Sequence, residues 1–273
     1  TIRQRTGATG KQLERLKDDF RAVFREVPAS ADEVATAIAD INTRLGLTGR
    51  PLRRMAEQLV ELSRITETDL ATNIREVTRA MGDWKVPAAE QPELLDKMFR
   101  ASQATGIAVA DLARQMTDGG VQLRAMGFSV DETIALLSRF EREGVVSSRI
   151  VNSLRMGLAR MAQEGVTDTS EAFDQLIDRI KNAGSVGEAT RLAIEVFGSR
   201  AGPDMALAIR EGRLELDELI KQVKSGEDTI VGVAEETDDW RESLMQLRNR
   251  ALLALEKPAM KVFDLLGLAA TGA

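Results

Sequence analysis

The sequence contains no cysteine, no histidine and no tyrosine among its 273 residues. Without cysteine, the chain forms no disulfide, offers no thiolate nucleophile and builds no cysteine-based zinc site. Without histidine, it lacks the side chain that titrates near neutral pH and serves most often as a general acid or base. We therefore predict that the protein is not an enzyme and that it has no catalytic, cofactor-binding or metal-binding residues.

Long apolar runs and a basic excess are missing as well. A membrane-spanning helix needs about 20 mostly apolar residues, and the nearest candidate, residues 260–270, is shorter and contains Lys261 and Asp264. We predict no transmembrane segment in this chain. The formal net charge is −6, whereas phosphate binding needs a concentrated basic surface, so we predict no sequence-specific nucleic-acid partner. The chain begins with Thr1 rather than methionine, and we expect it to be part of a longer protein.

The residues that are present favour helices. Aromatic residues make up 4% of the chain and prolines number six, while 43% of the residues are apolar. Helix starts of the type Ser/Thr-x-x-Glu/Asp recur, in which the hydroxyl accepts a backbone N–H and the carboxylate reaches back. Three of them precede apolar residues at three- and four-residue spacing: Ser30 with Glu33, Thr66 with Asp69, and Ser129 with Glu132. We predict an all-α fold, a multi-helix bundle of about ten short amphipathic helices with a longer C-terminal helix.

The last segment differs from the rest because its apolar residues alternate spacings of three and four along a single predicted helix from Ile230 to Ala254. This spacing is typical of a coiled-coil or bundle seam. The residues that we expect to contact a partner are Val233, Trp240, Leu244, Leu247 and Ala251. Pro258 should interrupt the helix. The alternative is that the helix folds back on its own domain. We divide the chain into an N-terminal helical segment (1–27), a helical core module (28–225) and a C-terminal oligomerisation or docking segment (226–273).

Three local patterns resemble functional sites only in part. Residues 6–11 (TGATGK) share glycines and a lysine with a phosphate-binding loop but lack its spacing and its preceding strand. An acidic cluster could attract a cation, although on a helix only residues three or four apart align, and a solvated face is the simpler interpretation. Its members are Glu235, Glu236, Asp238 and Asp239. The basic residues between positions 3 and 25 are interleaved with acidic ones, which favours a solvated or intersubunit face.

Several segments, taken in order, resemble the core region of phage tail tape measure proteins. The most specific is Ala125–Leu137, followed by 143–145 and 150–155. Further similar segments are Ala101–Gly106, the stretch from Ile194 to Gly198, and Ala201–Leu207. In that family, the Phe-Gly turn near residue 198 joins two helices. The last helix, with Trp240, Leu244 and Leu247, is also similar, so the resemblance covers most of the chain.

This resemblance implies a structural protein of a long-tailed phage, a prophage or a tail-like particle. Such a protein occupies the tail lumen, helps to set tail length during assembly in the host cytoplasm, and leaves the tail during genome ejection. The partners implied are further copies of the chain, the tail tube and the tail-tip proteins. Two other classes stay open: an independent helical protein-binding module, and an envelope-active helical domain.

Overall fold

The computed structural model describes residues 1–142, 168–213, 216–239 and 241–254, with single residues or pairs at 154, 158–159, 162–163 and 165–166 between them. Throughout these residues the regular structure is helical and no strand occurs, which confirms the predicted all-α class. The chain forms two compact units. Unit 1 contains Thr1–Thr78, Pro87–Pro92 and the segment from Thr229 onward, and unit 2 contains Arg79–Val86 and Glu93–Asp228. The predicted segment boundaries (1–27, 28–225 and 226–273) stay a prediction.

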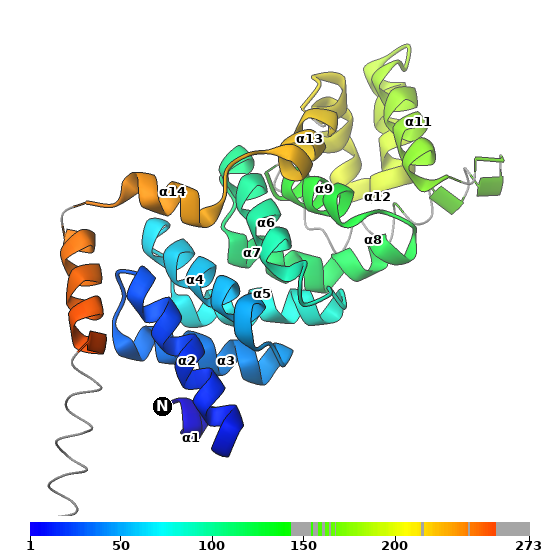
Figure 1. Ribbon diagram of the computed structural model, residues 1–273. Helices are drawn as coiled ribbons and strands as arrows, with labels where there is room; N and C mark the ends of the chain where they lie inside the picture. The colour runs from blue at the N-terminus through cyan, green and yellow to red at the C-terminus, as the bar shows by residue number, and fades with distance from the viewer. Residues whose placement is uncertain are drawn as a thin grey trace, which may run out of the picture. The chain divides into compact units, whose positions relative to one another are not determined.

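Unit 1 is built on three helices that pack pairwise: α2 (Gly10–Glu26), α3 (Ala31–Leu45) and α4 (Gly49–Ile65). The short α1 (Ile2–Thr6) packs on α3, and α14 (Ile230–Thr237) packs on α4 (Figure 1). The helix α5 (Leu70–Asp83) begins in unit 1 and ends in unit 2. Each of the three central helices buries the apolar stripe that its three-and-four spacing predicts. The fully buried members include Leu16, Ile38, Ile41, Leu52, Met55 and Leu59.

Two of the three predicted helix starts are confirmed. Ser30 accepts the Glu33 N–H at 3.3 Å, and the Glu33 carboxylate accepts the Ser30 N–H at 2.8 Å. Ser129 and Glu132 make the same reciprocal pair at 3.2 and 2.7 Å. The prediction for Thr66 is wrong: its hydroxyl donates to the Leu62 carbonyl, and the Asp69 carboxylate caps α5 by accepting the Thr72 N–H at 2.8 Å. Asp is as good an N-cap as Ser or Thr, and the helix therefore starts at Asp69 rather than at Thr66.

Unit 2 contains α6 (Gln91–Thr105) from Glu93 onward, α7 (Val109–Gln115), a π-helical turn (Met116–Gly120), α8 (Val121–Ala125) and α9 (Val130–Arg142). These are followed by α11 (Thr169–Lys181), α12 (Val186–Arg210) and α13 (Asp217–Ser225). The helix α11 packs on α12, and α13 packs on α9 (Figure 1). Trp84 is buried in this unit, and its Nε1–H donates to the Met116 carbonyl at 3.1 Å. Gly120 packs against the Trp84 ring. There is no room for a side chain at this position, because a Cβ would lie 2.9 Å from Trp84 Cζ2.

The expected Phe-Gly turn is present inside α12. Gly198 has φ 81° and ψ 164°, which breaks the helix into two parts, a conformation open essentially to glycine alone. After the turn, Gly202 lies so close to the first part that a Cβ would come within 2.6 Å of the Ile194 Cα. The two parts therefore form a tight helical corner in which one glycine makes the turn and the other allows the close approach.

The predicted single C-terminal helix is divided in the structure. The helix α14 ends at Thr237, Asp238 has extended backbone angles, and helical structure resumes over residues 241–254. The reason is local: the Asp239 carboxylate accepts the Arg241 N–H at 2.7 Å, and the Glu242 carboxylate accepts the Asp239 N–H at 3.2 Å. A short acidic side chain is more stable as a cap than inside a helix.

Some predicted features fall on parts of the chain that the structure leaves undescribed. Trp240, an expected partner contact, lies outside the described residues, as do Pro258 and the family-like stretch 143–145. Among the helices that the structure does describe, none combines the length and apolar content needed to cross a bilayer.

Candidate functional site: the C-terminal arm

Residues 229–254, here called the C-terminal arm, return to unit 1 after the chain has built unit 2. The first part of the arm, α14, is started by Thr229, whose hydroxyl accepts the Gly232 N–H at 3.1 Å. Ile230 and Ala234 are buried, and the helix packs on α4. Val233, one of the expected partner contacts, is half-buried on this helix.

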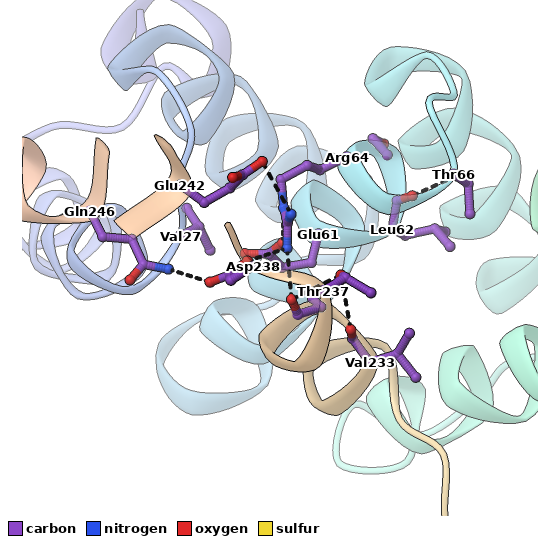
Figure 2. A network of polar contacts seen from close by, with 12 residues as sticks. Val27, Glu61, Leu62, Arg64, Thr66, Val233, Thr237, Asp238, Glu242 and Gln246 are labelled. Atoms are coloured by element: carbon purple, nitrogen blue, oxygen red, sulfur yellow. Dashed lines mark hydrogen bonds and ion pairs between the residues drawn. The ribbon is translucent and has the colours of Figure 1, made fainter. Parts of the chain in front are cut away.

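A single arginine on α4 holds the middle of the arm. The Arg64 guanidinium donates to Glu61 on its own helix at 2.7 Å, to Asp238 at 2.7 Å and to the Ala234 carbonyl at 3.1 Å. It also lies 3.7 Å from the Glu242 carboxylate. Figure 2 shows this side chain pointing into the space between the end of α14 and the start of the next helix. Because the guanidinium is planar and has several donors, it can bind groups from three segments together.

Three carboxylates, those of Glu61, Asp238 and Glu242, surround the Arg64 guanidinium. Burial raises the pKa of Glu61, and the nearby Asp238 and Glu242 raise it further, while the bond to Arg64 acts in the opposite direction. Burial also raises the pKa of Glu57, one helical turn earlier, with additional repulsion from Glu61, Glu26 and Glu235. The arm is therefore attached at a place where negative charge is crowded, and removal of the one guanidinium would leave its acidic neighbours uncompensated.

The helical residues 241–254 are attached to unit 1 by polar side chains. Asn249 is buried, and its Nδ2 donates to the carbonyls of Val27 and Ala29 at 3.2 and 3.0 Å. Arg250 donates to the Arg25 carbonyl at 3.2 Å. These bonds satisfy carbonyls in and after the last turn of α2, where no intrahelical donor is present. The inward side of this helix is thus largely polar.

Its outward side carries an apolar stripe beside exposed Arg241, Arg248 and Arg250. Leu244, Leu247 and Leu252 are 53%, 62% and 49% exposed, and Met245 is 38% exposed. Ala251 is exposed as well. A helix that packs on its own domain normally turns its apolar stripe inward, whereas here Leu244 and Leu247 face outward and Leu253 is half-buried. The exposed Leu244 and Leu247, one helical turn apart, make this face a candidate interaction surface.

The structure brings together part of the predicted contact set. Leu244, Leu247 and Ala251 lie on the outward face, and Val233 lies on a different helix. Sequence reasoning missed Arg64 and Asn249. Asn249 carried a signal, because a polar residue within a leucine-rich helix often specifies how that helix pairs. Arg64 carried none, since arginine on a helix surface is common.

The other patterns of interest have structural roles. Gly7 and Gly10 have φ of 67° and 53° and form the turn between α1 and α2. Among the basic residues of the first helices, Arg5 pairs with Asp40 at 2.8 Å, Lys17 with Glu14 at 2.9 Å and Arg21 with Asp18 at 2.9 Å. Asp238 binds Arg64 and Asp239 is a helix cap, and no group of three potential ligands with metal-binding geometry occurs among the described residues.

Comparison with known proteins identifies the family. Residues 17–250 match the model of the family described as phage-related minor tail protein. Over 157 residues the chain is 22% identical to the tape measure protein of Pneumococcus phage Dp-1, a match that covers 58% of this chain and 14% of that protein. The chain thus spans a small part of the length of that relative. No solved structure matches significantly. With a family match that runs from within α2 to residue 250 of the arm, the chain belongs to the phage-related minor tail protein family.

Proposed function

We propose that this chain is a helical module of a tape measure protein, a non-enzymatic component that occupies the lumen of a phage tail. In this role it helps to set tail length during assembly in the host cytoplasm and is released during genome ejection, with the tail tube and tail-tip proteins as partners. The observation that supports this most is the family match over residues 17–250. The all-helical fold agrees with it, because a helix rises by about 1.5 Å per residue and so converts chain length into physical length.

Tail length in the encoding phage tests the proposal. In-frame deletion of residues 93–228, which belong to unit 2, should shorten the tail by up to about 200 Å if this part is extended in the lumen, and by less if it stays compact. The control is a full-length variant with Val186→Asp and Leu207→Asp, two exposed apolar residues of unit 2, which should keep the normal length. Intact tails of unchanged length after the deletion would contradict the ruler role.

We further propose that copies of the chain associate through the outward face of residues 241–254. The support is the exposure of Leu244 and Leu247, whose burial against a partner removes apolar surface from water. Light-scattering chromatography should show an oligomer for the parent and a folded monomer for the variant with Leu244→Asp and Leu247→Asp. The Val186→Asp and Leu207→Asp variant is the matched control and should keep the parent mass. If the unmutated protein is a monomer even at high concentration, the self-association proposal is wrong.

A further inference from the structure

The arm and the rest of unit 1 meet through carboxylates on both sides. On α4, Glu61 is buried and lies one turn after the half-buried Glu57. On the arm, Asp238 lies 2.7 Å and Glu242 lies 3.7 Å from the Arg64 guanidinium. The same guanidinium binds Glu61 at 2.7 Å (Figure 2). The arm-side carboxylates are at most 27% exposed, so water and salt screen the repulsion less than on an open surface. Docking of the arm therefore brings like charges together.

Glu57 is exposed to repulsion from three elements. Burial is the main cause of its raised pKa, and Glu61 on the same helix adds to it. Glu26 on α2 and Glu235 on α14 raise the pKa further, while Arg54 lowers it. Because Glu235 belongs to the arm, its contribution is lost when the arm leaves. Docking therefore acts against the ionised form of Glu57.

Glu61 responds in the same direction. Burial is the main cause of its raised pKa, the hydrogen bond and charge of Arg64 lower it, and the arm-side Asp238 and Glu242 raise it. Arg64 lies three positions from Glu61 on the same helix and stays there when the arm leaves, whereas the two repelling carboxylates do not. The ionised form of Glu61 is thus disfavoured less after release.

The other contacts of the arm depend little on pH. Ile230 and Ala234 are buried on α14, which packs on α4. The Asn249 amide donates to two backbone carbonyls, and an amide does not titrate. Arg250 lies 3.4 Å from Glu26, and both side chains are about half exposed, so this pair contributes little. The carboxylates at the joint are the groups through which protons can act on docking.

We propose that the arm is a proton-dependent strap, docked most firmly when Glu57 and Glu61 carry protons and shifted toward release when both are ionised. Above the raised pKa values, both glutamates are ionised in the docked and the released forms, and the repulsion is complete. As the pH falls through those values, the docked form takes up protons first, so docking becomes more favourable. Near the ordinary pKa of 4.5, the released form is protonated as well and the gain ends. Release uncovers Arg64 and the surface of α4 beneath α14.

Thiol labelling of the full chain tests the proposal, since no native cysteine competes. Ala234 is buried on α14, so Ala234→Cys should react with 4,4′-dithiodipyridine only when the arm has moved away. The rate at each pH is divided by that of the same variant unfolded in urea. From about pH 5 to about pH 8 this ratio should rise at least tenfold, because each unit by which docking raises a pKa changes the docking equilibrium tenfold.

Two controls separate release of the arm from unfolding of the whole unit. Ala37 is fully buried in α3, and the normalised rate of Ala37→Cys should stay at least about tenfold below that of Ala234→Cys at the higher pH. Addition of Glu57→Gln and Glu61→Gln to Ala234→Cys should remove the rise with pH. Addition of Glu236→Gln, an exposed acid of the same arm, should leave the rise unchanged.

Hydrogen exchange of α14 in the unmutated protein, corrected for the intrinsic effect of pH, gives the same information without a cysteine. The proposal is overturned if labelling and exchange of α14 do not change with pH, if the rise persists with Glu57→Gln and Glu61→Gln, or if Ala37→Cys and Ala234→Cys react at equal rates. The inference goes beyond the tail role and is measured on the isolated chain, so its failure would leave the tail-length test unaffected.

Discussion

Arg64 on α4 donates a hydrogen bond to the carboxylate of Asp238, 174 positions later in the chain, at 2.7 Å. This bond joins the first part of unit 1 to the arm that completes it, across all of unit 2 in sequence (Figure 2). The same guanidinium binds Glu61 and the Ala234 carbonyl. Arg64, surrounded by acids, thus attaches the middle of the arm, while Asn249 and Arg250 attach residues 241–254.

Replacement of Arg64 should release the arm. In Arg64→Met, the hydrogen bonds to charged groups are lost and Glu61, Asp238 and Glu242 repel one another, which should lower the free energy of unfolding by about 2 kcal/mol. Hydrogen exchange should rise in α14 and residues 241–254 more than in α2 and α3. The control is Arg75→Met, whose exposed pair with Glu76 should contribute about 0.5 kcal/mol. Equal stability of the two variants would show that Arg64 does not anchor the arm.

Glu57→Gln should stabilise the protein at neutral pH. Burial and neighbouring carboxylates raise the pKa of Glu57 in the folded state, so its ionised form disfavours folding. For the parent, this penalty is relieved as the pH falls through the raised pKa, and stability should rise over that interval. In Glu57→Gln the urea midpoint at pH 7 should be higher and this rise smaller. Exposed Glu236→Gln is the control, and a lower midpoint for Glu57→Gln would refute the expectation.

Loss of the N-terminal cap of the helix at residues 241–254 should fray the first turn of that helix. Asp239→Ala removes the acceptor for the Arg241 and Glu242 N–H groups, and amide exchange at these two positions should accelerate. Ser30→Ala is a useful comparison, because loss of its cap at α3 should destabilise the fold by about 1 kcal/mol without changing exchange in the arm.

Alanine substitutions at two glycines of α12 should change the stability of the protein in opposite directions. Gly202→Ala places a Cβ 2.6 Å from the Ile194 Cα, so the two halves of the corner must separate, and the free energy of unfolding should fall by about 2 kcal/mol. Gly187→Ala meets nothing closer than 3.9 Å and should stabilise by up to about 0.5–1 kcal/mol, because alanine has less conformational freedom to lose. Thermal unfolding of both variants checks this. Destabilisation of similar size in each would mean that the close approach at Gly202 is not the cause.

The sequence by itself determined the local structure and the family of this protein. Apolar residues at three- and four-residue spacing specify amphipathic helices, and a cap such as Ser30 acts within its own turn, so both follow from short-range rules. The turn at Gly198 was also predictable, because glycine there matched a family motif. These features depend on residues that are neighbours in the sequence and not on tertiary contacts.

Only the tertiary structure decided which way each helix faces and what holds it. Periodicity shows that residues 241–254 have a leucine face, but it does not show that Asn249 would turn inward to two backbone carbonyls and leave Leu244 and Leu247 exposed. The bond between Arg64 and Asp238 likewise depends on packing that brings distant segments together. Such contacts depend on how two packed surfaces complement each other. A helical pattern in the sequence describes only one of these two surfaces.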